Sequence, residues 1–123
     1  GINDNYRRIN AREQMGRDDS VWAFYRQLIA LREHATYGDT VVYGRTEPVL
    51  EEERNIMAYF RRGEGQDILV IGNFDEEPKM VTIAGIKEQG QVLLNNCGSV
   101  DMDGGRIRLE SCQAVVIGYG KKY

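Results

Sequence analysis

The pattern of apolar and polar positions changes its period near residue 38. Between residues 21 and 31, apolar side chains recur at intervals of three and four, which places them on one face of an α-helix. Beyond residue 39, apolar and polar residues alternate within short runs, as they do in strands that bury one face. The pattern therefore predicts a single amphipathic helix followed by a β-rich segment.

The helix is predicted to span residues 20–34. Asp18, Asp19 and Ser20 precede or begin its apolar stripe, and such side chains accept hydrogen bonds from the unpaired N–H groups at a helix start. Gly38 follows a little beyond the predicted end, where glycine commonly stops a helix.

The remaining segments predict seven or eight short strands. The first two segments are either separate strands or one strand interrupted by a bulge at Gly44. Residues 68–71 form a continuous apolar run, which is expected of a central strand covered on both faces. The predicted strands are residues 40–43, 46–51, 55–61, 68–71, 79–84, 91–95, 106–109 and 113–119, with a loop at 97–105. This spacing favours a mainly β fold, in which an antiparallel Greek-key β-sandwich follows the helix.

Composition narrows the class of protein. A length of 123 residues suits one domain, and a net charge of −3 gives no electrostatic argument for nucleic acid or an anionic membrane as partner. No apolar run reaches the roughly 20 residues of a membrane-spanning helix. The first residues show no signal-peptide pattern, so a cytoplasmic location is expected. The start at Gly1 rather than at Met indicates either a tag remnant or a proteolytic piece.

Cysteine and histidine are scarce. Cys97 and Cys112 are too few for a disulfide scaffold and lie in or beside predicted strands, so buried thiols are the ordinary interpretation. A single bridge between them remains an alternative if their strands are neighbours. His34 is the only histidine. An imidazole can act as a general base, but the place of His34 at the predicted helix end favours a capping role.

Other polar and aromatic groups are candidate sites. The acidic runs at 51–53 and 75–77 fall in predicted turns, where solvated charge is a better interpretation than a catalytic carboxylate pair. Residues 101–105 faintly resemble a calcium loop but lack its spacing and its distal glutamate, so a tight turn is favoured. Trp22 and the seven tyrosines could stack on sugars, although aromatic residues at helical spacing usually pack in a core.

Residues 20–32 resemble a helix written S-V-x-x-F-Y-x-x-L-I-x-L-R in the glucosidases of glycoside hydrolase family 13, within the α-amylase superfamily. This group contains oligo-1,6-glucosidases, α-glucosidases, dextran glucosidases and trehalose-6-phosphate hydrolases. The resemblance extends over the chain in the family's order. The matching motifs are N-P-N-Y-x-x-I-N at 3–10, V-Y-G at 42–44, L-E-E/D at 50–52, I-x-A-Y-x-R at 56–61, L-V-I-x-N-F at 69–74 and L-L-x-S-N at 92–96.

The chain departs from the family pattern at two places. Asp4 stands where the family usually has proline, in the loop ahead of the helix. Residues 111–113, Ser-Cys-Gln, replace the more usual R-P-[WY]-E at the closing strand. Neither departure concerns catalytic chemistry.

The resemblance implies a division of the chain. Such enzymes are (β/α)8 barrels with active sites at the C-terminal ends of their strands. Residues 1–38 would be the end of the barrel, including its last helix, and residues 39–123 would be the C-terminal β-sandwich domain. Asn3 and Asn5 would lie near the substrate. The catalytic aspartate nucleophile, glutamate acid/base and second aspartate all lie upstream in the family, so no catalytic residue, metal ligand or cofactor is expected here.

Three functions follow as hypotheses. The first is the C-terminal part of a retaining, exo-acting α-glucosidase, inactive alone, which stabilises the catalytic barrel of the same enzyme. That barrel would be its partner, the intact enzyme would act on oligosaccharides, and the uncovered helix stripe would allow self-association. The second is a free-standing carbohydrate-binding β-module, and the third is a protein-interaction module. The specificity for α-1,6 bonds, α-1,4 bonds or a phosphorylated disaccharide stays open.

Overall fold

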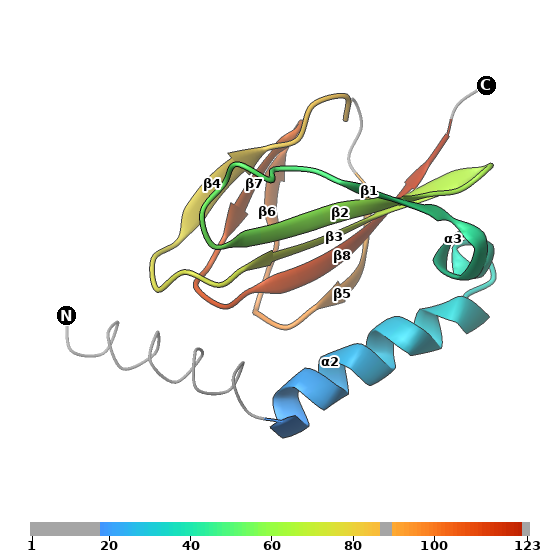
Figure 1. The fold of residues 1–123 in the computed structure, drawn as a ribbon, viewed down its shortest axis with the longest axis horizontal. Coiled ribbons are helices and arrows are strands. Elements are labelled where there is room, and N and C mark those ends of the chain that lie inside the picture. Colours follow the sequence, from blue (N-terminus) through green and yellow to red (C-terminus); the bar gives the residue numbers. More distant parts are fainter. Residues whose placement is uncertain (1–17, 87–89, 122–123) are drawn as a thin grey trace.

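The computed structural model describes residues 18–86 and 90–121, and side chains from residue 23 onward. A helical layer lies on one side of a β-sandwich (Figure 1). The helices are α2 (Asp18–Ala30), the short 3₁₀ helix η1 (Leu31–Glu33) and α3 (Gly38–Tyr43). The strands are β1 (Arg45–Pro48), β2 (Ile56–Arg62), β3 (Gln66–Asn73), β4 (Lys79–Thr82), β5 (Gln91–Asn95), β6 (Asp101–Asp103), β7 (Arg106–Leu109) and β8 (Ala114–Gly120).

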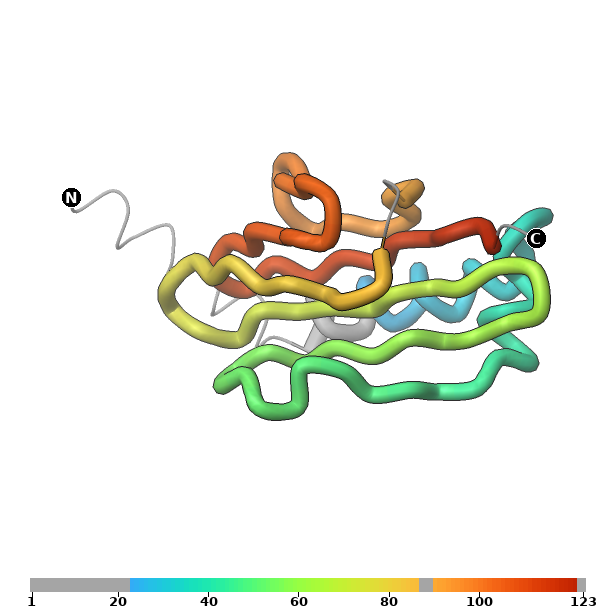
Figure 2. Tube along the Cα trace, turned by 90° about the horizontal axis from the view of Figure 1, so that it is seen from above, coloured from blue at the N-terminus to red at the C-terminus, as the bar shows by residue number. Residues whose placement is uncertain are grey.

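Two antiparallel sheets form the sandwich. The first has the strand order β1-β2-β3-β8-β5, and the second has the order β4-β7-β6. The chain passes between the sheets at β4, β5, β6 and β8, so neighbours in space are often distant in sequence. Figure 2 shows the extended segments running side by side along the long axis of the molecule. At the edge strand β5, the pairing with β8 is irregular between Val92 and Leu94.

Strand β3 lies between two apolar cores. Leu69 and Ile71 face the core between the sheets, where they pack with residues of β2, β4, β7 and β8. Ile68 and Val70 face the opposite side, where they pack with the helical layer. All four side chains are buried. The prediction that the apolar run at 68–71 is a central strand covered on both faces is therefore confirmed.

The predicted strand at 40–43 is wrong, because these residues belong to helix α3. Gly44 is accordingly no β-bulge but the residue that ends α3, with its N–H bonded to the Thr40 carbonyl at 3.0 Å. The cause lies far along the chain. The Arg61 guanidinium donates to the carbonyls of Val41 and Val42, and the Thr40 hydroxyl donates to the Gln66 carbonyl.

Most other predictions agree with the structure. The helix predicted at 20–34 is α2 followed by η1, and the strands at 91–95 and 106–109 are β5 and β7 with the predicted bounds. The second predicted strand, 46–51, is shorter and becomes β1. The loop predicted at 97–105 is wrong in its middle, which forms strand β6. The fold class, a helix at the N-terminal side and a mainly antiparallel β-sandwich, is confirmed.

Candidate functional site

The helices cover the face of the five-stranded sheet that points away from the second sheet (Figure 1). Tyr59, Val70 and Val116 form one row across this face, since they pair in register on β2, β3 and β8. Apolar side chains from the helical segment pack against this face. They are Phe24, Leu28, Leu31, Tyr37 and Val41. Burial of this kind supplies most of the stability of a short helix, because its backbone hydrogen bonds alone are marginal.

The same helices expose a second set of apolar side chains. Tyr25 and Ile29 of α2 are 55% and 41% exposed, and Val42 and Tyr43 of α3 are 47% and 82% exposed. Phe24 and Leu28, by contrast, are half-buried against the sheet. The helix stripe recognised in the sequence thus has a covered part and an uncovered part. Exposed apolar side chains on a helix are typical of a surface that meets another protein segment.

Arg61 ties the helical layer to strand β2. Its guanidinium lies 2.9 Å from the Val41 carbonyl, 3.3 Å from the Val42 carbonyl and 2.9 Å from the Thr46 hydroxyl. A positive charge at this end of α3 satisfies carbonyls that have no partner within the helix. Burial raises the pKa of the nearby Tyr59 hydroxyl above its ordinary value, while the charge of Arg61 opposes that increase.

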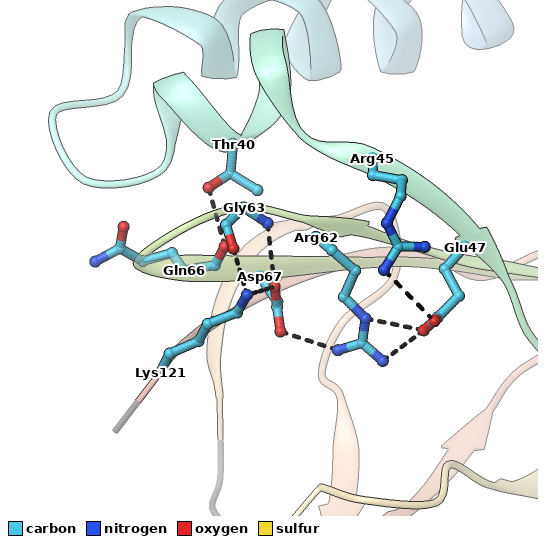
Figure 3. A network of polar contacts seen from close by, with 8 residues as sticks. All are labelled: Thr40, Arg45, Glu47, Arg62, Gly63, Gln66, Asp67 and Lys121. Atoms are coloured by element: carbon cyan, nitrogen blue, oxygen red, sulfur yellow. Dashed lines mark hydrogen bonds and ion pairs between the residues drawn. The ribbon is translucent and has the colours of Figure 1, made fainter. Parts of the chain in front are cut away.

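A polar network lies around the turn between β2 and β3 (Figure 3). Asp67 is buried, and it accepts hydrogen bonds from the Arg62 guanidinium at 2.9 Å and the Gly63 N–H at 3.2 Å. The Lys121 ammonium lies 3.3 Å from the same carboxylate. Arg62 also binds Glu47 at 2.6 Å and stacks over the Phe60 ring. A buried carboxylate needs such partners, since its burial without them would be costly.

Asparagine and glutamine side chains secure the loops at the other end of β3. The Asn73 amide is fully buried and donates to the carbonyls of Glu77, Leu109 and Glu110 at 3.0–3.3 Å. Gln113 donates to the Asn95 side chain and the Ser99 carbonyl, and it accepts the Glu110 N–H. Within the described residues, no buried side-chain nitrogen or oxygen lacks a partner. The side chains of Asn73 and Gln113 therefore hold the loops in place.

The acidic runs lie on turns, as predicted. Glu51, Glu52 and Glu53 are exposed in the β1–β2 turn. The Asp75 carboxylate accepts the Glu77 N–H at 3.3 Å and binds Lys79, so it stabilises its own turn. Hydrogen bonds from the Asn55 side chain and the Glu77 backbone hold the pKa of Asp75 at about 2.

The remaining candidates from the sequence also have structural roles. His34 ends η1, and its Nδ1 accepts the N–H groups of Thr36 and Tyr37 at 3.1 and 3.2 Å, so its side chain stabilises the turn after the helix and not the last helix carbonyls. Residues 101–105 form part of the β6–β7 hairpin, where Gly104 has a φ of 61°. Cys97 and Cys112 are thiols, half-buried and buried respectively.

Three of the sequence candidates lie outside what the structure describes. Asn3 and Asn5 precede the described residues, and Trp22 precedes the first described side chain. Across the described ranges, no three histidine, cysteine, aspartate or glutamate side chains are grouped so that they could hold a metal ion. None of the helices in those ranges is long and apolar enough to cross a membrane.

The network around Asp67 was not predicted from the sequence. Its signal was a charged residue directly before the apolar run at 68–71, because a carboxylate at the start of a buried strand needs a cation. The identity of that cation could not be read from the pattern. Arg62 is five residues away in the sequence, whereas Lys121 is separated from Asp67 by almost half of the chain.

Comparisons with known proteins agree with this arrangement. Residues 56–116 match the family described as the alpha-amylase SusG C-terminal domain. The chain is 35% identical over 94 residues to the probable oligo-1,6-glucosidase 3 of Bacillus subtilis, with 76% of this chain and 16% of that protein covered. It is 37% identical over 76 residues to the oligo-1,6-glucosidase of Bacillus cereus, covering 62% and 13%.

A solved structure shares the fold. The trehalose-6-phosphate hydrolase of Bacillus licheniformis superimposes with a TM-score of 0.69 at 24% identity, covering 89% of this chain and 20% of that one. The chain therefore spans about an eighth to a sixth of the length of the curated relatives it matches and about a fifth of this structure. The sequence matches to the curated relatives and to the family model show that the chain belongs to the glucosidases of glycoside hydrolase family 13, in the α-amylase superfamily, and corresponds to their C-terminal part.

Proposed function

We propose that this chain is the non-catalytic C-terminal part of a retaining α-glucosidase, and that it stabilises the catalytic barrel of the larger enzyme. The larger enzyme would hydrolyse terminal α-1,6- or α-1,4-glucosidic bonds in oligosaccharides. The support for the reaction class is the set of relatives, which are named oligo-1,6-glucosidases and a trehalose-6-phosphate hydrolase.

The observation that carries the stabilising role is the two-sided helix α2. Phe24, Leu28 and the following Leu31 pack on the sheet, whereas Tyr25 and Ile29 are exposed on another side of the same helix segment. A helix with apolar side chains on two sides is expected between two layers, because each layer buries one of them. The catalytic barrel would supply the second layer.

The test compares three proteins: the isolated 123-residue chain, the enzyme with its barrel, and that enzyme truncated before β1. The substrates are isomaltose, maltose and trehalose 6-phosphate. We expect hydrolysis by the intact enzyme, none by the isolated chain, and a lower thermal midpoint after truncation. Hydrolysis by the isolated chain, or an unchanged midpoint after truncation, would contradict the proposal.

The same proposal divides the chain near residue 38, with the barrel end at 1–38 and the β-domain at 39–123. It places Asn3 and Asn5 near the substrate. In the intact enzyme, Asn3→Ala and Asn5→Ala are expected to raise KM, with little change in the thermal midpoint. Unchanged KM values in both variants would contradict the placement of these residues near the substrate.

We further propose that the isolated chain self-associates through α2 and that the enzyme is cytoplasmic. Exposed Tyr25 and Ile29 support the first point. The absence of a disulfide at Cys97 and Cys112 agrees with the second, since disulfides are rare in reducing compartments. Sedimentation of the isolated chain should show a concentration-dependent mass that Ile29→Glu lowers, and cell fractionation should recover the enzyme with cytosolic markers. A monomer at all concentrations would reject the first point, and recovery outside the cytosol would reject the second.

A carbohydrate-binding module is the second candidate, favoured by the 82% exposure of Tyr43 and the 45% exposure of Phe74. Exposed aromatic rings can stack on sugars. Calorimetry of the isolated chain against isomaltose and maltose separates the candidates. Saturable binding that Tyr43→Ala abolishes would establish the module and overturn the purely stabilising role.

A further inference from the structure

We propose that Asp67 and Lys121 form a latch that couples the end of strand β8 to helix α3. The latch consists of this ion pair and the turn at residues 63–65, in which both side chains bind Gly63 (Figure 3). The proposal concerns the chain itself and does not depend on the activity of a larger enzyme.

The first half of the latch joins β8 to the turn. The Lys121 backbone N–H donates to the Gly65 carbonyl at 3.0 Å, and its ammonium donates to the Gly63 carbonyl and lies 3.3 Å from Asp67. Asp67 in turn accepts the Gly63 N–H. One residue beyond β8 therefore holds the turn through its backbone and its side chain.

The second half joins the turn to α3. The buried Thr40 hydroxyl donates to the Gln66 carbonyl at 3.1 Å. A Cβ atom placed on Gly63 would lie only 2.4 Å from the Thr40 hydroxyl oxygen, so the turn and the helix are in close contact. Displacement of the turn would break the Thr40 hydrogen bond and remove a contact that supports the helix.

Helix α3 depends on such outside support. It has six residues, which is too short for a helix to persist through its own hydrogen bonds. Its contacts outside itself include Thr40 on the turn and Arg61 on its last carbonyls. Loss of the latch should therefore open α3 locally while the sandwich core, held by β3 and β8, stays closed.

The chain contains a matched control for this lysine. Lys79 lies 3.3 Å from the Asp75 carboxylate and donates to the Arg54 carbonyl, so its partners are of the same kind as those of Lys121. Asp75 follows the end of β3, whereas Asp67 lies near its start. Removing the Lys79 charge alters a similar ion pair without touching the turn that holds Thr40.

The test is hydrogen exchange of the full 123-residue chain with Lys121→Met, Asp67→Asn and Lys79→Met. Both latch variants should speed exchange of the α3 amides, those of Val41 and Gly44, by about fivefold, since a partly buried ion pair is worth roughly 1 kcal/mol. Exchange in β3 and β8 should change much less, and Lys79→Met should leave α3 as it is. If Asp67→Asn does not fold, Lys121→Met decides alone.

Ionic strength provides a second measurement. Raising the salt to about 1 M shortens the screening length to about 3 Å, so it should speed α3 exchange in the wild type but not in Lys121→Met. Unchanged α3 exchange in Lys121→Met would overturn the latch. A uniform increase at all amides, or the same effect from Lys79→Met, would also overturn it by showing general destabilisation.

Discussion

The Tyr37 ring lies directly on Gly118. A Cβ atom on Gly118 would come within 2.4–2.8 Å of three carbons of that ring. Tyr37 belongs to the connection between η1 and α3 and is buried, while Gly118 lies on β8 next to Ile68 of β3. Because Gly118 of β8 has no side chain, the Tyr37 ring can pack directly on the sheet and hold the helical layer against it.

Gly118→Ala should therefore destabilise the chain by about 1–3 kcal/mol, the usual cost of overpacking a core. Urea unfolding followed by circular dichroism measures the change. Gly65→Ala is the control, because a Cβ atom there would meet nothing within 4 Å. Equal stability of the two variants would show that the ring moves aside without cost.

Low pH should destabilise the turn after β3 by protonating Asp75. Hydrogen bonds from Asn55 and the Glu77 backbone, with Lys79 nearby, lower the pKa of this carboxyl to about 2 from 3.8. Because the folded-state pKa is depressed, the contribution to stability is present above about pH 4 and disappears as the pH falls towards 2. NMR titration of the carboxyl carbon should give a midpoint near 2, and Asn55→Ala should raise it. A midpoint near 4 in the wild type would contradict this prediction.

High pH should lower the stability of the folded chain by ionising Tyr119. Burial raises the pKa of this phenol to about 12 from 10.0. The folded state therefore favours the neutral form, so the stability contribution is intact below pH 10 and disappears as the pH rises from about 10 to 12. Tyr119→Phe should show a smaller loss of stability over that range. The tyrosinate absorbance of the variant, subtracted from that of the wild type, isolates the titration, and a midpoint at 10 would disprove the shift.

Asn73 should tolerate no replacement that cannot donate. Its amide group donates to three carbonyls from two loops and is fully buried. Asn73→Ala should cost about 2–4 kcal/mol, because buried carbonyls lose their partner. Asn73→Asp should cost more, since a carboxylate would face those carbonyl oxygens. Thermal unfolding tests both against Gln91→Ala, an exposed change on β5; a loss no larger than in that control would refute the pinning role.

Periodicity was sufficient wherever one pattern dominated a segment. The three- and four-residue spacing identified α2 with η1, and the continuous apolar run identified β3 as doubly covered. Both signals are local, because each reflects the burial of side chains on one element. The family motifs likewise led to the C-terminal β-domain that the comparisons show.

Periodicity failed where distant contacts decided the conformation. Thr40, Val41 and Val42 are β-branched and favour strands locally. Their helical conformation depends on Arg61 and Gln66, which lie about twenty residues or more along the chain. The same limit applies to the candidate site. A cation near Asp67 could be predicted from the sequence, but its identity as Lys121 could not.

The irregular pairing of edge strand β5 has a consequence for aggregation. A regular, flat edge would offer unpaired backbone groups to a strand of another molecule. The irregularity between Val92 and Leu94 interrupts that template, and at the opposite edge β1 carries Arg45, Glu47 and Pro48. Both edges of the larger sheet thus resist the addition of strands from other molecules, so any association of the chain is directed away from the sheet edges.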